Sequence, residues 1–270
     1  KGLRVDPQPH LDLLWSGREP AGDDFVEWLA ERVAASPGDV LSWVVMAHDV
    51  AAPAVWGREG EFLSSARLDN LCSAFGAVDA LCDRATDDPD STTYGVVALF
   101  DHEEVGSLTA TGAASTAIRG IIDRLAAGWG LDAPAVAALL ARSALLSADM
   151  AHATHPNQPE RHEPSHPIRL GAGPVIKVNA AQRYATDALT SADLELACRS
   201  VGVPTQTYVH RADMACGSTI GPTVAASLGI PTVDAGLPQL SMHSIRETMA
   251  VADLGHQHAM MTAWLTAPLS

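Results

Sequence analysis

The chain has 270 residues, of which 47% are hydrophobic and 18% are charged, so it holds enough apolar material for a folded core. This composition excludes a disordered or collagen-like protein. The 17 basic residues are outnumbered by 32 acidic ones, and the net charge of −15 excludes the clustered positive charge with which proteins bind nucleic acid or anionic membranes.

Along the chain, apolar runs of strand length alternate with segments of helical period, a pattern typical of an α/β domain. Residues 1–22 are rich in proline and glycine and predict a linker or the tail of a preceding subdomain, whereas residues 23–270 form the main domain. We therefore expect one central mixed, largely parallel sheet flanked by helices. In chain order, the expected elements are a helix at 24–35, a strand at 40–46, a helix at 68–84, a strand at 94–100, helices at 111–128 and 133–143, strands at 145–150 and 175–178, a helix at 191–201, a strand at 205–209, a helix at 219–228, a strand at 232–235 and a helix at 244–265.

The cysteines indicate a reducing compartment. Cys72, Cys82, Cys198 and Cys216 lie far apart and form no Cys-x-x-Cys pair, which argues against a zinc ribbon and a secreted disulfide framework. The apolar runs are too short or too interrupted to cross a bilayer, so we expect a cytoplasmic protein without a membrane partner. The chain begins without a methionine or a signal peptide, and we expect it to be part of a longer protein.

Lysine use is unusual, because Lys1 and Lys177 are the only lysines in the chain. Lys177 lies within the predicted strand at 175–178, where an unpaired ammonium group would be unfavourable if it were buried. Two interpretations remain open. Lys177 is either an edge-strand residue that faces water or a buried functional group.

Polar residues follow the predicted strands, at the positions where α/β sheets bind their ligands. Glu103 and Glu104 come after the strand at 94–100, and Asp149 follows the apolar residues 145–148 of the strand predicted at 145–150. Asp69 and His243 lie at the starts of two predicted helices. Adjacent carboxylates repel each other, so a fold keeps such a pair either on a solvated surface or with one member beside a cation and the other as a proton acceptor.

Carboxylates together with imidazole, without a nearby thiolate, are the ligand set of hydrolytic zinc, manganese or cobalt sites. More such ligands are present than one ion needs, which favours two metal ions that share a bridging carboxylate, as in aminopeptidases and phosphatases. The α/β pattern with scattered ligands favours an exopeptidase.

Several sequence motifs occur in an order that matches a known family. They are ARLDN (66–70), DHEEVGS (101–107), DMAH (149–152), HPN (155–157), GPVIKVN (173–179), QRYAT (182–186), CGSTIGP (216–222) and PQLSMHSIRE (238–247). With these motifs the chain resembles the C-terminal catalytic portion of the aspartyl aminopeptidases, a family of dinuclear zinc exopeptidases. The resemblance implies an α/β/α sandwich of the zinc-exopeptidase type.

The resemblance also implies roles for individual residues. Asp69 corresponds to the carboxylate that bridges both zinc ions, Glu104 and His243 correspond to the other ligands of one ion, and Asp149 corresponds to a ligand of the second. Glu103 corresponds to the general base. This assignment agrees with the chemistry, because an activated water needs a nearby carboxylate to accept its proton and return it to the leaving amine.

On the substrate side, His152, Lys177 and Tyr184 resemble residues that hold the peptide, and Lys177 would pair with an acidic N-terminal side chain. The resemblance therefore implies hydrolysis of N-terminal Asp or Glu from peptides. It further implies two zinc ions per intact subunit, with Mn²⁺ or Co²⁺ as alternatives, and a tetrahedral homododecamer.

One departure from the family concerns the second zinc ion. In the family, this ion takes a histidine from an upstream segment that does not occur in these 270 residues, and we expect one metal position to be a ligand short. His48, after the strand predicted at 40–46, is the alternative donor, although the family does not use this position. Two other functions remain open: an aminopeptidase of broader specificity, and a metal-deficient relative or fragment that acts as an assembly subunit.

Overall fold

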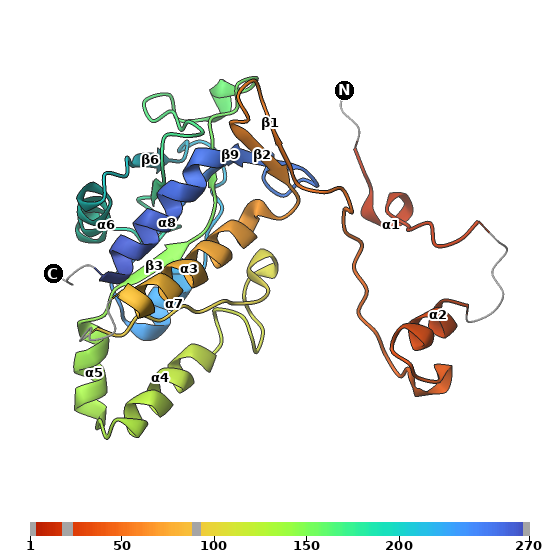
Figure 1. Cartoon of the computed structure of the whole chain (residues 1–270), viewed down its shortest axis with the longest axis horizontal. Coiled ribbons are helices and arrows are strands. Elements are labelled where there is room, and N and C mark those ends of the chain that lie inside the picture. The colour runs from red at the N-terminus through yellow and green to blue at the C-terminus, as the bar shows by residue number, and fades with distance from the viewer. Residues whose placement is uncertain (1–3, 18–23, 88–92, 267–270) are drawn as a thin grey trace. The chain divides into compact units, whose positions relative to one another are not determined.

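The computed structural model describes residues 4–17, 24–87 and 93–266, and the chain divides into two compact units, Lys1–His48 and Asp49–Ser270 (Figure 1). The first unit contains α1 (Pro7–His10), α2 (Asp24–Arg32) and the 3-10 turn η1 (Pro37–Asp39). Its aromatic side chains cluster, with the ring centroid of Trp15 4.7 Å from that of Trp28. The division into residues 1–22 and 23–270 stays a prediction.

The second unit contains a four-stranded sheet in the order β3-β7-β5-β6. Its strands are β3 (Leu145–Ala148), β5 (Val175–Val178), β6 (Gln206–Val209) and β7 (Thr232–Gly236). The pairs β3–β7 and β5–β6 are parallel, whereas β5 and β7 are antiparallel. Valine and isoleucine suit buried strands of this kind, and Val175 and Ile176 are fully buried. The predicted mixed, largely parallel sheet is confirmed.

A second sheet of five strands continues from the first, in the order β1-β2-β9-β8-β4. Its strands are β1 (Ala54–Trp56), β2 (Phe62–Ser65), β4 (Ala151–His152), β8 (Pro238–Leu240) and β9 (Glu247–Ala250). The chain passes from β3 to β4, and again from β7 to β8, within a few residues. At this crossing a Cβ atom on Gly236 would overlap the Asp149 carbonyl oxygen, so the close approach requires glycine.

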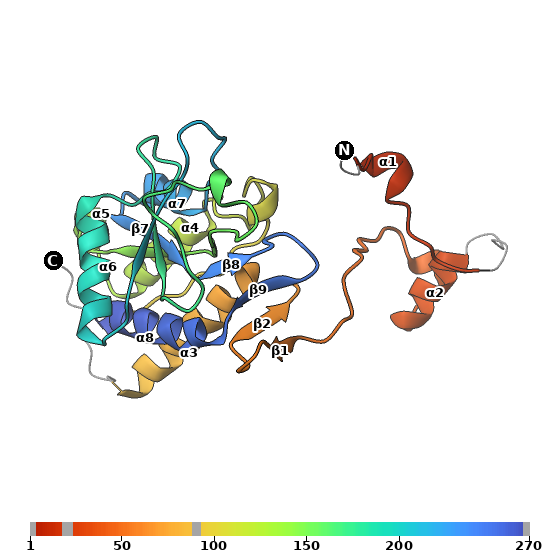
Figure 2. The same ribbon diagram turned by 90° about the horizontal axis from the view of Figure 1, so that it is seen from above.

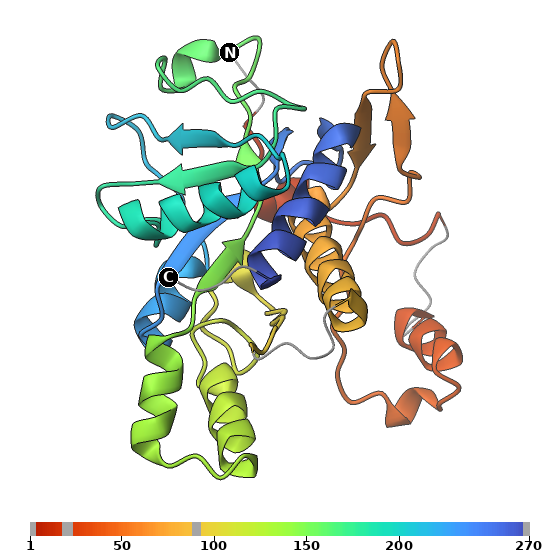
Figure 3. The same cartoon turned by 60° about the vertical axis from the view of Figure 1, so that its left-hand side comes forward.

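Helices cover both faces of the four-stranded sheet and complete the predicted α/β/α layers. On one face, α3 (Leu68–Asp87), α6 (Ala188–Ser200) and α8 (Val251–Thr266) bury Leu194 and Met260 against Ile176 and Val233. The neighbours α3 and α8 lie side by side and run in the same direction, because Ser73 contacts Gln257 near their starts and Arg84 contacts Leu265 near their ends (Figure 1, Figure 3). On the other face, α4 (Ala117–Gly128), α5 (Ala133–Ala141) and α7 (Gly221–Leu228) form further apolar clusters (Figure 2). Two 3-10 turns, η2 (Glu103–Val105) and η3 (Pro159–Arg161), complete the elements of this unit.

Two strand predictions are wrong. Residues 40–46 and 94–100 form no strand and appear in neither sheet among the described residues. An apolar run of strand length is therefore not sufficient for a strand when no other segment pairs with its backbone. Their side chains are correspondingly exposed, with Leu41 at 91% and Tyr94 at 69%.

Helix boundaries also differ from the predictions. The helix predicted at 244–265 begins only at Val251, because residues 247–250 form β9 between β2 and β8. The helix predicted at 111–128 begins at Ala117. For residues 247–250, hydrogen-bonded pairing with β2 and β8, which lie elsewhere in the chain, outweighed the local helical pattern of the sequence. Within the described part of the chain, no helix is long and apolar enough to cross a membrane.

Candidate metal centre and active site

Three potential metal ligands from distant parts of the sequence converge at one end of the sheets. Asp69 comes from the first turn of α3, Glu104 from η2 and His243 from the turn after β8. Each offers one ligand atom, and these atoms all lie within 4.8 Å of one another. The Nε2 atom of His243 is 3.1 Å from both Asp69 Oδ2 and Glu104 Oε1. The Asp69 side chain is 5% exposed and that of His243 is 59% exposed, so the group opens to solvent on one side.

The local backbone explains how Asp69 reaches this group. Asp69 and Asn70 depart from helical geometry at the start of α3, with φ −82° and ψ 110° at Asp69. The Asn70 side chain donates a hydrogen bond to the Ala148 carbonyl, with an Nδ2 to oxygen distance of 2.8 Å. This bond joins the first turn of α3 to the end of β3, where Asp149 follows.

The two glutamates lie on the short turn η2, which is closed by residues in the left-handed region. His102 has φ 62° before the turn and Gly106 has φ 97° after it, a conformation that favours glycine. Glu103 is half-buried, whereas Glu104 is exposed. Burial raises the pKa of Glu103, and the charges of Asp149 and Glu104 raise it further, against the opposing effect of Lys177.

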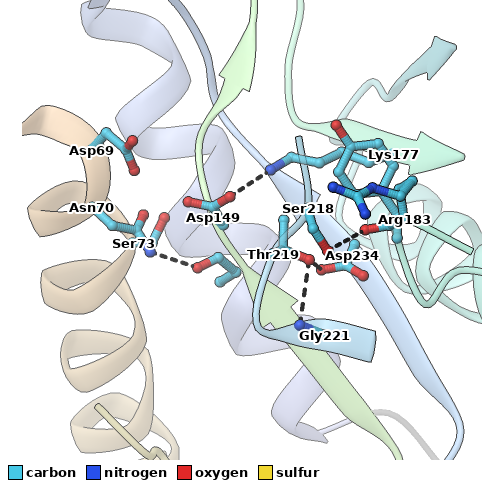
Figure 4. Close-up of polar contacts among 12 residues, drawn as sticks. Asp69, Asn70, Ser73, Asp149, Lys177, Arg183, Ser218, Thr219, Gly221 and Asp234 are labelled. Carbon is cyan, nitrogen blue, oxygen red and sulfur yellow. Dashed lines mark hydrogen bonds and ion pairs between the residues drawn. The ribbon is translucent and has the colours of Figure 1, made fainter. Parts of the chain in front are cut away.

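Lys177 is buried and forms an ion pair with Asp149. Its Nζ atom lies 2.9 Å from Asp149 Oδ2, and the residue is only 3% exposed (Figure 4). The Tyr184 ring lies close by, with its centroid 5.6 Å from Nζ. Because β5 is an interior strand between β7 and β6, the interpretation of Lys177 as an edge-strand residue that faces water is wrong.

The predicted site residues line one cavity of about 180 Å³. They are Asp69, Glu103, Glu104, Asp149, His152, Lys177, Tyr184 and His243. Burial lowers the pKa of His152 to about 4, with a further contribution from the charge of Lys177, so this imidazole is neutral at pH 7. Burial also raises the pKa of Tyr184, which keeps its hydroxyl protonated. The structure thus brings all of these side chains together, and their individual roles stay predictions.

The concentration of negative charge is compatible with metal binding. Burial raises the pKa of Asp69 to about 7, and the neighbouring carboxylates of Asp149, Glu104 and Glu247 raise it further. Oxygen and imidazole donors of this kind suit zinc, and a divalent cation would compensate the mutual repulsion of the carboxylates. The donor set therefore fits the metal that the sequence predicts.

Some residues around the site were not predicted from the sequence. Asp234 is fully buried, and its carboxylate accepts a hydrogen bond from the Thr219 hydroxyl at 2.6 Å (Figure 4). The same carboxylate accepts a second hydrogen bond from the Ala185 N–H, also at 2.6 Å. His210 also lines the cavity, and its Nδ1 atom is 2.6 Å from the Tyr208 hydroxyl. No motif marks either residue, because each is defined by contacts with distant segments.

Comparison with known proteins agrees with this geometry. Residues 17–265 match the model of the aminopeptidase I zinc metalloprotease (M18) family. The chain belongs to the M18 family. The "probable M18 family aminopeptidase 2" of Mycobacterium tuberculosis is 46% identical over 274 residues, a match that covers 100% of this chain and 63% of that relative. The chain thus spans less than two thirds of the length of this curated M18 relative.

Solved structures show the same fold as this M18 chain. A cryo-EM structure of the Ape4 and Nbr1 complex superposes with a TM-score of 0.83 at 34% identity, covering 93% of this chain and 50% of the other. The mApe1 dodecamer of Saccharomyces cerevisiae gives a TM-score of 0.78 at 28% identity, covering 90% of this chain and 56% of the other. The M18 neighbours confirm the zinc-exopeptidase fold that the motifs imply.

Proposed function

We propose that the protein is a zinc aminopeptidase that removes aspartate or glutamate from the N-terminus of peptides. One observation supports this most: the convergent ligands Asp69, Glu104 and His243 share a cavity with the half-buried Glu103 and the buried cation of Lys177. Membership of a zinc metalloprotease family supports the metal and the reaction class.

In the proposed site, Asp69, Glu104 and His243 would hold one zinc ion, and Asp69 and Asp149 would be ligands of a second. Mn²⁺ or Co²⁺ are alternatives with the same donor chemistry. When bound, zinc supplies Lewis-acid polarisation of the scissile carbonyl and lowers the pKa of a water molecule toward 7. His48 belongs to the first compact unit, and its role as a further donor stays a prediction.

Glu103 serves as the general base of the reaction. Its carboxylate accepts a proton from the attacking water and then delivers that proton to the nitrogen of the leaving amine. Its raised pKa suits the first step, because a carboxylate of higher pKa is a stronger base and accepts the proton from water more readily. Acid–base catalysis of this kind contributes about 10²–10⁴-fold in rate.

Lys177, Tyr184 and His152 hold the substrate. The Lys177 ammonium attracts the carboxylate of an N-terminal Asp or Glu side chain, and its burial excludes the water that would weaken this attraction. His152 is neutral at pH 7 and therefore offers hydrogen bonds rather than charge. Among the described residues that line the cavity, Lys177 is the only lysine or arginine, and the expected preference for acidic residues follows from its charge.

A second candidate, an aminopeptidase of broader specificity, is favoured by one contact. The Lys177 ammonium already pairs with Asp149 at 2.9 Å, so part of its charge is compensated before substrate binds. The values of kcat/KM for Asp-, Glu- and Leu-anilides separate the two candidates. Higher values for Asp and Glu support the acidic specificity, and a preference for Leu supports the second candidate.

The reaction class is tested with the same substrates in the presence of a chelator. We expect hydrolysis to be lost on chelation and restored by added zinc. A zinc-saturated, folded protein that hydrolyses none of the anilides or the corresponding peptides would contradict the proposal and favour a non-catalytic assembly role.

Self-assembly into a tetrahedral dodecamer is part of the proposal. The similarity to the yeast mApe1 dodecamer supports it. Light scattering is expected to give a mass twelve times the 28.2 kDa of the chain. A monomeric mass at micromolar concentration would contradict this assembly.

A further inference from the structure

A buried carboxylate lies directly behind the three convergent ligands. Glu247 is the first residue of β9 and is 2% exposed. Its Oε2 atom accepts a hydrogen bond from the Asp69 N–H at 2.9 Å, and its Oε1 atom accepts one from the His243 N–H at 2.7 Å. One side chain therefore contacts the main chain of two of the three convergent ligands.

The position of β9 in the sheet explains this double contact. Glu247 pairs in register with Ser65, the last residue of β2, and the chain then turns into α3 and reaches Asp69. On its other side β9 pairs with β8, which leads into the turn that carries His243. The carboxylate of Glu247 consequently lies between two segments that are adjacent in space but distant in the chain.

Both ligand residues have a backbone conformation that needs support. His243 has φ 64°, in the left-handed region that non-glycine residues rarely adopt, and Asp69 is non-helical at the start of a helix. Such conformations persist when the surrounding structure holds them. Hydrogen bonds from N–H groups to an ionised carboxylate are about twice as strong as neutral ones, so Glu247 can provide this support.

We infer that Glu247 is a positioning residue for the metal centre, which it acts on by fixing the backbones of Asp69 and His243. The inference rests on the proposed function, because it assumes that these side chains bind a metal ion. Glu247 contacts the ligands through their N–H groups and is not itself a ligand. Partners that orient metal ligands in this way typically change metal affinity about 10–100-fold when they are mutated.

Another buried carboxylate provides a matched control. Asp253 lies six residues further along, is also fully buried, and also accepts two backbone hydrogen bonds, from Gly171 at 2.7 Å and Gly173 at 3.0 Å. These glycines lie outside the set of residues that line the cavity. A variant at Asp253 therefore reproduces the loss of a buried, doubly hydrogen-bonded carboxylate without touching the ligand backbones.

The test measures Co²⁺ binding to the 270-residue chain by titration and by visible absorption. Glu247→Gln keeps the size of the side chain, but its amide nitrogen cannot accept, so either Asp69 or His243 loses its acceptor. We expect Co²⁺ affinity to fall about 10–100-fold and the cobalt absorption bands to change in position and intensity. We expect Asp253→Asn to lower the melting temperature while leaving the affinity and the spectrum unchanged.

Each outcome decides between the inference and the proposed function. If the wild-type chain binds no Co²⁺, the proposed function fails and the inference fails with it. If wild type binds Co²⁺ and Glu247→Gln binds it equally with the same spectrum, only the inference is overturned. Equal losses of Co²⁺ affinity in Glu247→Gln and Asp253→Asn would indicate a general destabilisation of the fold and would also overturn the inference.

A second variant covers the case in which Glu247→Gln does not fold. Glu247→Asp retains the negative charge but is one methylene group shorter, so it cannot reach both N–H groups at once. We expect Co²⁺ affinity to fall at least about tenfold in this variant. A folded Glu247→Asp protein with unchanged affinity and spectrum would overturn the positioning role.

Discussion

The Nε2 atom of His243 lies 3.1 Å from Oδ2 of Asp69, although the two residues are 174 positions apart in the chain. The same nitrogen lies 3.1 Å from Oε1 of Glu104. An imidazole between two carboxylates offers three donors around a common point, which is the number of protein ligands that catalytic zinc sites use. The metal chemistry proposed for the protein depends on this convergence.

The pH dependence of stability is expected to show that the ionised form of Asp69 is unfavourable in the folded protein. Its pKa is about 7 in the folded protein, against an ordinary value of 3.8. Between these values the folded protein keeps a proton that the unfolded chain has lost, so the free energy of unfolding falls as pH rises from about 4 to about 7. The metal-free Asp69→Asn variant has no carboxyl group at this position, so its free energy of unfolding should not show this fall. Its stability relative to wild type should therefore be higher at pH 8 than at pH 5.

Urea denaturation of both proteins in the presence of a chelator measures the difference. Added zinc should stabilise wild type at pH 8, because the ion binds the ionised form of the folded protein. The prediction fails if the difference in unfolding free energy between wild type and Asp69→Asn is the same at pH 5 and pH 8.

Replacing the proposed base should separate catalysis from metal binding. Glu103→Gln is expected to lower kcat by about 10²–10⁴-fold, because the amide cannot accept the proton. Its Co²⁺ affinity should stay close to that of wild type, since Glu103 is not among the convergent ligands. Glu104→Gln serves as the control and should weaken Co²⁺ binding. Unchanged turnover in Glu103→Gln would rule out its role as the base.

The acidic specificity is expected to depend on the charge of Lys177. In Lys177→Met, the ratio of kcat/KM for the Asp-anilide to that for the Leu-anilide should fall at least about tenfold, because the ammonium that would pair with the substrate carboxylate has been removed. Arg183 is a matched control: it is another nearby cation, but its guanidinium donates to the Gly217 and Cys216 carbonyls. Arg183→Met should keep the wild-type ratio. Retained acidic preference in Lys177→Met would argue against the proposed pairing.

The sequence predicted the elements whose signal is local. Strand 175–178 matches β5 because a β-branched, buried run defines it, and helix α3 follows from its apolar spacing. Strand β9 was predicted as helix, because its partners β2 and β8 lie elsewhere in the chain. The segment at 94–100 shows the converse error, since it has strand composition without a described pairing partner.

The same distinction applies to the site. Family motifs identified side chains that the structure brings into one cavity, including Lys177, whose burial the sequence left open. Glu247 stood within a motif but received no role, because its contacts are with backbone N–H groups that no side-chain pattern reveals. Asp234 was missed for a similar reason, since its partners come from two loops.

A buried hydrogen bond behind the site is expected to contribute measurably to stability. The Thr219 hydroxyl donates to the fully buried carboxylate of Asp234 at 2.6 Å. Thr219→Val removes this donor, and a hydrogen bond to a charged group contributes about 1.5–3 kcal/mol. Thr86→Val, at an exposed helical threonine, should change stability by no more than about 0.5 kcal/mol. Equal effects of the two substitutions in urea denaturation would contradict the structural role of Asp234.

The most direct measurement is an anomalous difference map, recorded at the zinc absorption edge from crystals of the wild-type chain grown with zinc. We predict a strong peak among the side chains of Asp69, Glu104 and His243, within coordination distance of all three. A map from zinc-saturated crystals without a peak at this position would contradict the proposed metal centre.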